Sequence, residues 1–144
     1  MKELVKAIIS KFTAAPGGIH NDLYNAVQGR MYDGETEKAT YPYIVFLLPI
    51  SDDPESESTF TEETEDILMQ FSIYSKNFSR VEIDNIFSYL KTLFDRCTLD
   101  ITGYDLVWMR RQSATLMNEN YITTDGTTRI RHYAVDYLIL LEVK

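Results

Sequence analysis

The sequence predicts an α+β fold, in which a mostly antiparallel sheet of about four to five strands carries helices on one side. Residues 79–97 repeat apolar side chains at intervals of three and four, which is the spacing of one helical face. Strand-like runs lie on both sides of this segment, and no other helical run is long enough to be its partner. We therefore expect a central helix packed on a sheet. At 144 residues the chain is predicted to be a single domain, 1–144.

The predicted central helix has N-terminal capping signals as well as an apolar face. Ser79 is placed to cap the first turn, and Glu82 follows at the capping-box spacing. Phe78 and Ile83 are placed to form a hydrophobic staple across that turn. The face predicted to be buried consists of Ile83, Ile86, Phe87, Leu90, Leu93, Phe94 and Cys97.

The region before the sheet predicts two helices and one short strand. Residues 2–12 show a helical apolar stripe that ends before Pro16 and two glycines. Residues 21–28 predict a second, short helix that Gly29 is placed to stop. Residues 30–33 predict a brief strand. The N-terminal helix is expected on the same side of the sheet as the central one.

Four longer runs predict the main strands. Residues 41–50 are apolar at nearly every position, and residues 66–75 alternate apolar and polar side chains. Residues 104–117 and 129–143 predict the last two strands. The connections 51–65 and 118–128 are long and polar, and the second contains an Asp125-Gly126 turn signal. We expect both to be loops that project from the body.

Most of the net charge of −8 is concentrated in the first of these connections. This connection holds seven acidic residues and no basic one, so the rest of the chain is close to neutral. The seven acids are Asp52, Asp53, Glu55, Glu57, Glu62, Glu63 and Glu65. The segment lacks the glycine of a calcium loop. It fits a solvated loop, an interaction arm, or a channel lining past which DNA slides without sticking. No clustered basic run predicts sequence-specific nucleic-acid binding.

The residues that carry chemistry are few. His20 and His132 have no metal-ligand spacing to an acid or cysteine, and Cys97, the only cysteine, falls on the apolar helix face. Arg110 and Arg111 are adjacent, so they should point to opposite faces of a strand, with a salt bridge for at least one. We predict no catalytic residue, cofactor or metal. The sequence shows neither a signal peptide nor a membrane span, so we expect a cytoplasmic protein with no membrane partner.

The order and spacing of several segments resemble one known family. A helix leads to Arg-Met-Tyr-Asp-Gly-Glu (30–35), then to Tyr-Pro-Tyr-Ile-Val (41–45). After a polar connection come Phe-Ser-Ile-Tyr-Ser (71–75), the helix from Ser79, a long strand, and a closing strand with Tyr133 and Tyr137. This set, which spans nearly the whole chain, resembles the tail-completion or tail-terminator (head-to-tail joining) proteins of long-tailed bacteriophages.

The resemblance implies a structural virion protein rather than an enzyme. Such proteins form a ring, usually sixfold, at the head-proximal end of the tail tube, where they stop tube growth and join the tail to the head or neck. The implied partners are further copies of the chain, the tail tube protein and a neck or connector protein. Genomic DNA would pass through the ring, and assembly would occur in the bacterial cytoplasm. We expect the interface to include the seven acids above and Arg110, Arg111, Asn120, Tyr121 and Asp125.

Two alternatives remain open at this stage. The protein could be a different neck component, such as a head-completion subunit on the portal. It could also be a small ligand-binding or enzymatic α+β domain whose site forms only between subunits.

Overall fold

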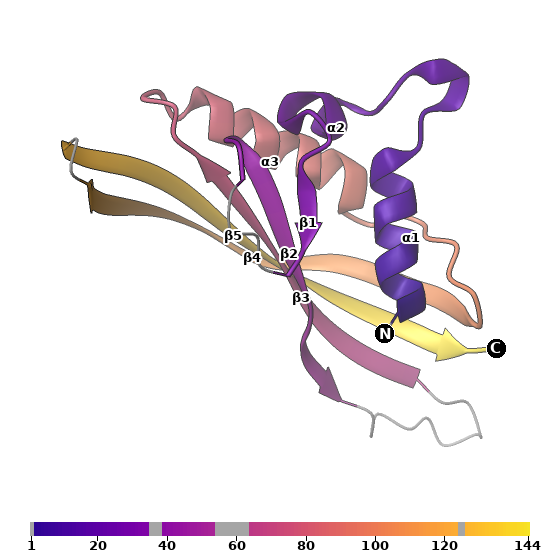
Figure 1. Ribbon diagram of the computed structural model, residues 1–144. Coiled ribbons are helices and arrows are strands. Elements are labelled where there is room, and N and C mark those ends of the chain that lie inside the picture. The colour runs from indigo at the N-terminus through magenta and orange to yellow at the C-terminus, as the bar shows by residue number, and fades with distance from the viewer. Residues whose placement is uncertain (1, 35–38, 54–63, 124–125) are drawn as a thin grey trace.

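The computed structural model describes residues 2–34, 39–53, 64–123 and 126–144. Its elements, drawn in Figure 1, are α1 (Lys2–Thr13), the 3-10 turn η1 (Pro16–Gly18), α2 (Asp22–Val27), β1 (Met31–Asp33), β2 (Tyr43–Asp53), β3 (Thr64–Ser75), α3 (Val81–Phe94), β4 (Tyr104–Thr123) and β5 (Gly126–Val143). The predicted α+β class is confirmed.

The five strands form one sheet in the order β1-β2-β3-β5-β4. Three neighbouring pairs are antiparallel, and β1 runs parallel to β2. The sheet is thus largely antiparallel, as predicted, but mixed. The parallel pair follows from the order of the chain, because residues 34–42 carry the chain back to the end of the sheet where β1 began. There the Ile44 amide donates to the Arg30 carbonyl oxygen at 2.9 Å.

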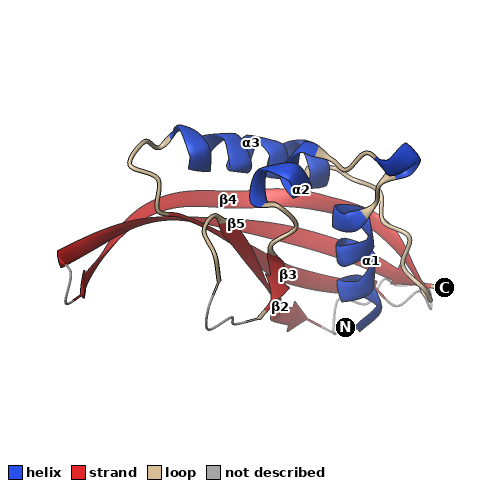
Figure 2. Cartoon of the chain, turned by 45° about the horizontal axis from the view of Figure 1, so that its top comes forward, coloured by secondary structure: helices blue, strands red, loops and turns tan. Residues whose placement is uncertain are grey.

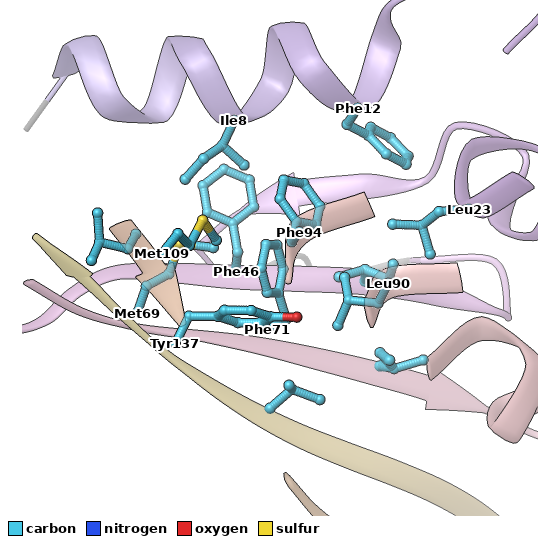
Figure 3. Close-up of a cluster of buried hydrophobic side chains, with 14 of the residues drawn as sticks. Ile8, Phe12, Leu23, Phe46, Met69, Phe71, Leu90, Phe94, Met109 and Tyr137 are labelled. Atoms are coloured by element: carbon cyan, nitrogen blue, oxygen red, sulfur yellow. The ribbon is translucent and has the colours of Figure 1, made fainter. Parts of the chain in front are cut away.

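All helices lie on one face of the sheet (Figure 2). Apolar side chains alternate with other side chains along β3, which gives the sheet one apolar face for the helices to cover. The side chains on that face are fully buried: Ile67, Met69, Phe71 and Ile73. From the helices, Leu4, Ile8, Leu90 and Phe94 complete the same cluster, part of which Figure 3 shows. Burying each such side chain contributes about 1.5–3 kcal/mol before conformational entropy is subtracted.

The start of α3 differs from its prediction. The helix spans Val81–Phe94 rather than 79–97, and its N-cap is Arg80, which makes no capping bond through its side chain. The Glu82 carboxylate accepts from Ser75 Oγ at 2.7 Å instead of closing a capping box with Ser79. Phe78 is 94% exposed, so the predicted staple does not form. A bond from the end of β3 has replaced the Glu82 half of the capping box, while Ser79 Oγ still accepts from the Val81 amide at 3.2 Å.

The two connections are shorter than predicted. Strand β2 continues to Asp53 and β3 begins at Thr64, so both ends of the predicted acidic loop 51–65 are strand; residues 54–63 lie outside the described residues. The predicted polar loop 118–128 is mostly strand, since β4 runs to Thr123 and β5 begins at Gly126. Backbone pairing between two neighbouring strands outweighed the polar side chains. Among the described helices, none has the length and apolarity to cross a membrane.

Candidate assembly surfaces

The hairpin of β4 and β5 extends well beyond the rest of the sheet (Figure 1). Strand β3 pairs with β5 only as far as Ser75 opposite Arg131, whereas β4 and β5 stay paired to Thr123 opposite Gly126. Of the predicted interface residues, Asn120 is exposed on this hairpin and Tyr121 lies in β4 opposite Thr128. Asp125 lies outside the described residues.

The predicted acidic residues fall at the opposite end of the sheet. Asp52 and Asp53 close β2, and Glu65 lies in β3, while Glu55, Glu57, Glu62 and Glu63 lie outside the described residues. Register places Asp53 directly opposite Asp66, and Asp105 opposite Glu142. Like charges directly opposite on neighbouring strands repel each other. This end of the sheet therefore brings several acidic residues together.

Arg110 and Arg111 lie on opposite faces, as predicted. Arg110 stacks on Trp108, with 4.5 Å from the guanidinium carbon to the ring centre, on the face without helices. Arg111 lies on the helix side and donates to Asp95 at 3.3 Å. The structure therefore does not bring the two arginines into one surface.

The Asp95 carboxylate is the centre of a polar network that the sequence did not reveal. It accepts from the Tyr137 hydroxyl at 2.5 Å as well as from Arg111. Burial, reinforced by the Asp95 hydrogen bond, raises the pKa of Tyr137 well above its ordinary value. The network ties the end of α3 to β4 and β5. The outward position of Asp95 at a helix end was the available signal, but it did not specify a partner.

The face without described helices carries an aromatic row. Tyr43 stacks on Tyr74 at 5.0 Å between ring centres, and Tyr74 stacks on His132 at 4.4 Å. Tyr41 packs against Tyr43 at 5.1 Å, and the Lys76 amine lies 4.4 Å from the centre of the Tyr41 ring. Burial raises the pKa of Tyr74. The row needs the register of three strands, so the sequence alone could not predict it.

The same face is apolar near its centre. Pairing places Leu68 opposite Leu138, and Leu140 opposite Trp108, with all four side chains pointing away from the described helices and partly exposed. Leu47, on the same face, is 46% exposed. Open faces of antiparallel sheets are usually polar, so this surface has the composition of a contact surface.

The histidine and cysteine side chains considered as reactive groups are packed against other side chains. The His20 ring stacks on Tyr24 at 3.7 Å. Cys97 is half-buried with its sulfur 3.5 Å from that of Met109, and burial raises the pKa of its thiol, which disfavours the reactive thiolate. Among the described residues, no three His, Cys, Asp or Glu side chains come together as metal ligands.

Comparison with known proteins returns two solved structures and one family model. A search of solved structures matches a chain of the "Virion of native gene transfer agent (GTA) particle" with a TM-score of 0.74 and 13% identity, covering 98% of this chain and 96% of that one. A second solved chain, whose name states no function, matches with a TM-score of 0.51 and 12% identity over 96% of this chain and 95% of its own. At such identities these likenesses establish a shared fold. No curated protein matches the sequence.

The family comparison covers most of the chain. The model of the family described as "Tail completion protein gp17" matches residues 20–142. This match takes in α2, α3 and all five strands, and it confirms the resemblance seen in the sequence. The chain therefore belongs to the tail completion protein gp17 family and is a structural protein of a phage-type tail.

Proposed function

We propose that the protein forms a ring, sixfold in symmetry, on the head-proximal end of the tail tube. The ring stops further tube subunits from adding and presents a surface to the neck. Its partners are other copies of itself, the tube protein and a neck or connector protein. Genomic DNA passes through its lumen without sequence-specific contacts.

One observation carries the proposal beyond family membership. The sheet has an apolar face that no described helix covers, and a hairpin extends past the sheet by the five residue pairs from Glu119–Ile130 to Thr123–Gly126. A ring needs one surface that matches a different surface on the next copy. A bare sheet face and a projecting hairpin are two such different surfaces on one subunit.

The residues proposed for these contacts are those at the two ends of the sheet. Asn120, Tyr121 and Asp125 are the predicted contacts from the region of the β4–β5 hairpin. The seven acids from Asp52 to Glu65 come from the end of β2, the start of β3 and the residues between these strands. The acids also suit a lumen lining, because negative charge repels the DNA backbone. Arg110, beside the bare apolar centre, is the arginine placed to meet a neighbour, whereas Arg111 is held by Asp95.

The test is electron microscopy of particles made when this gene carries an early stop codon. We expect over-long tails without heads, beside DNA-filled heads, because nothing then ends tube growth. A plasmid copy of the wild-type gene should restore joined particles, which controls for effects on neighbouring genes.

Two other outcomes would contradict the proposal in different ways. Tails of normal length that fail to join heads would identify a neck subunit that joins but does not terminate. Intact, infectious particles would remove the virion role altogether.

A further inference from the structure

One end of the sheet carries a group of basic side chains. Arg30, Lys76, Arg129 and Arg131, which we call the basic end, lie where β1 and β5 begin and β3 ends. Within the described part of the chain none of the four forms an ion pair. Arg131, for example, donates to the Phe78 carbonyl oxygen and the Asn118 amide oxygen. The nearby acid Glu119 is already engaged with His132 at 3.3 Å.

The other end of the sheet is acidic. Asp66, Asp105 and Glu142, which we call the acidic end, lie where β3 and β4 begin and β5 ends, and Asp105 is directly opposite Glu142 in the register of β4 and β5. Lys144 lies 3.5 Å from Asp105, but both side chains are more than half exposed, so water screens this pair strongly. The two ends are too far apart along β3 to neutralise each other within one molecule, because β3 is 12 residues long from Thr64 to Ser75.

An exposed phenylalanine stands beside the basic end. Phe78 is 94% exposed in the turn between β3 and α3, and its own carbonyl oxygen is held by Arg131 at 3.1 Å. A large aromatic side chain in water, fixed beside unpaired bases, is typical of an anchor at a protein interface. The turn does not need this side chain for its own packing.

The acidic end borders a groove that could receive such an anchor. The groove has a volume of 830 Å³ and lies between residues 96–99 and the first half of β4. Its lining includes the apolar residues Leu99, Leu106, Val107 and Trp108 and the charged residues Asp105, Arg96 and Arg110. Val107 is 48% exposed, and Arg110 is already stacked on Trp108. Apolar walls with aromatic and guanidinium groups suit an inserted phenylalanine ring.

From this charge complementarity we infer that neighbouring copies bind head to tail, the basic end of one copy on the acidic end of the next. Phe78 enters the groove beside β4, and Lys76 and Arg129 meet Asp66 and Asp105. Because the two surfaces differ, the contact repeats in one direction and can close into a ring. The inference rests on the proposed ring and identifies the surfaces that join its subunits.

Charge-swapped variants test the contact. One variant carries Lys76→Glu and Arg129→Glu, a second carries Asp66→Lys and Asp105→Lys, and a third carries all four changes. Each is supplied in place of the wild-type protein, and the amount retained on purified tails is measured by quantitative mass spectrometry. We expect the amount of each double variant on the tails to be at least roughly tenfold lower than that of the wild type. The fourfold variant should recover most of this loss.

Recovery in the fourfold variant is the informative result. The tube and neck proteins are unchanged, so only a contact between the two ends of neighbouring copies can restore binding. Lys2→Glu with Lys6→Glu, both exposed on α1, changes the net charge equally and should keep wild-type retention. Thermal melting of each purified variant checks that it folds. Wild-type retention of both double variants, or no recovery in the fourfold variant, would overturn the inference and leave the ring proposal to the stop-codon experiment.

Phe78→Ser tests the anchor separately. Because the side chain is 94% exposed, its loss should leave the melting temperature unchanged while retention on tails falls roughly tenfold. Ile19→Ser is the matched control, since Ile19 is 73% exposed and follows the 3-10 turn η1, outside the sheet. Equal retention of the Phe78 and Ile19 variants would exclude Phe78 as an anchor.

Discussion

At the scale of single residues, the Tyr137 hydroxyl makes the free energy of unfolding depend on pH in the alkaline range. In the folded protein, burial and the bond to Asp95 raise the pKa of Tyr137, so it keeps its proton where the unfolded chain, near pKa 10, releases it. The unfolded state then binds fewer protons, and the free energy of unfolding falls as pH rises above about 10. Below that pH the stabilisation is fully present.

Tyr137→Phe isolates this effect. The variant should lose about 0.5–2 kcal/mol near neutral pH, because Asp95 loses a hydrogen-bond donor. Above pH 10 the free energy of unfolding of the wild type should fall more steeply, by up to about 1.4 kcal/mol per pH unit. Urea titrations across this range measure both curves. Parallel curves would show that Tyr137 titrates alike in both states. Tyr74 and Cys97 also have raised pKa values, but they contribute equally to both proteins.

Some contacts of single residues depend on nearby sequence and could be predicted, whereas others depend on residues far along the chain and could not. Opposite faces for Arg110 and Arg111 follow from strand pleating, so the sequence could predict them. The bond between Asp95 and Tyr137 joins residues 42 apart, and its existence depends on how α3 lies on β5. Ser79 Oγ accepts from the Val81 amide of the first turn at 3.2 Å, but the capping box with Glu82 failed for the same reason, because the partner of Glu82 came from β3.

At the scale of elements, the apolar face of α3 holds the helix on the sheet. Leu90 is fully buried in the central cluster with Phe71 and Phe94. Leu90→Ala should lower the free energy of unfolding by about 2–5 kcal/mol, through lost burial and the cavity left behind. Ser88→Ala, on the exposed side of the same helix, should change it by less than about 0.5 kcal/mol. Chemical denaturation measures both, and equal effects would mean that α3 is not a core element.

Elements were more predictable than their ends. The 3.6-residue and two-residue periods identify α3 and β3, since each reflects which face meets the core. The ends of β4 and β5 were set too short, because polar residues such as Asn118 and Thr128 indicate a loop unless a neighbouring strand pairs with them. The parallel direction of β1 was also missed, since three residues carry no signal of strand direction.

At the scale of the whole molecule, the length of the β4–β5 hairpin should matter for assembly and not for folding. In the sheet register, residues 120–123 and 126–129 pair only with each other, so replacing residues 120–129 by an Asn-Gly turn should leave the melting temperature nearly unchanged. We expect the shortened protein to be monomeric and absent from tails, which then grow beyond normal length. Arg129→Ala separates the loss of one charge from the loss of reach, and it should weaken retention less than the truncation does. If the shortened protein still ended tubes at their normal length, the hairpin would have no part in the ring.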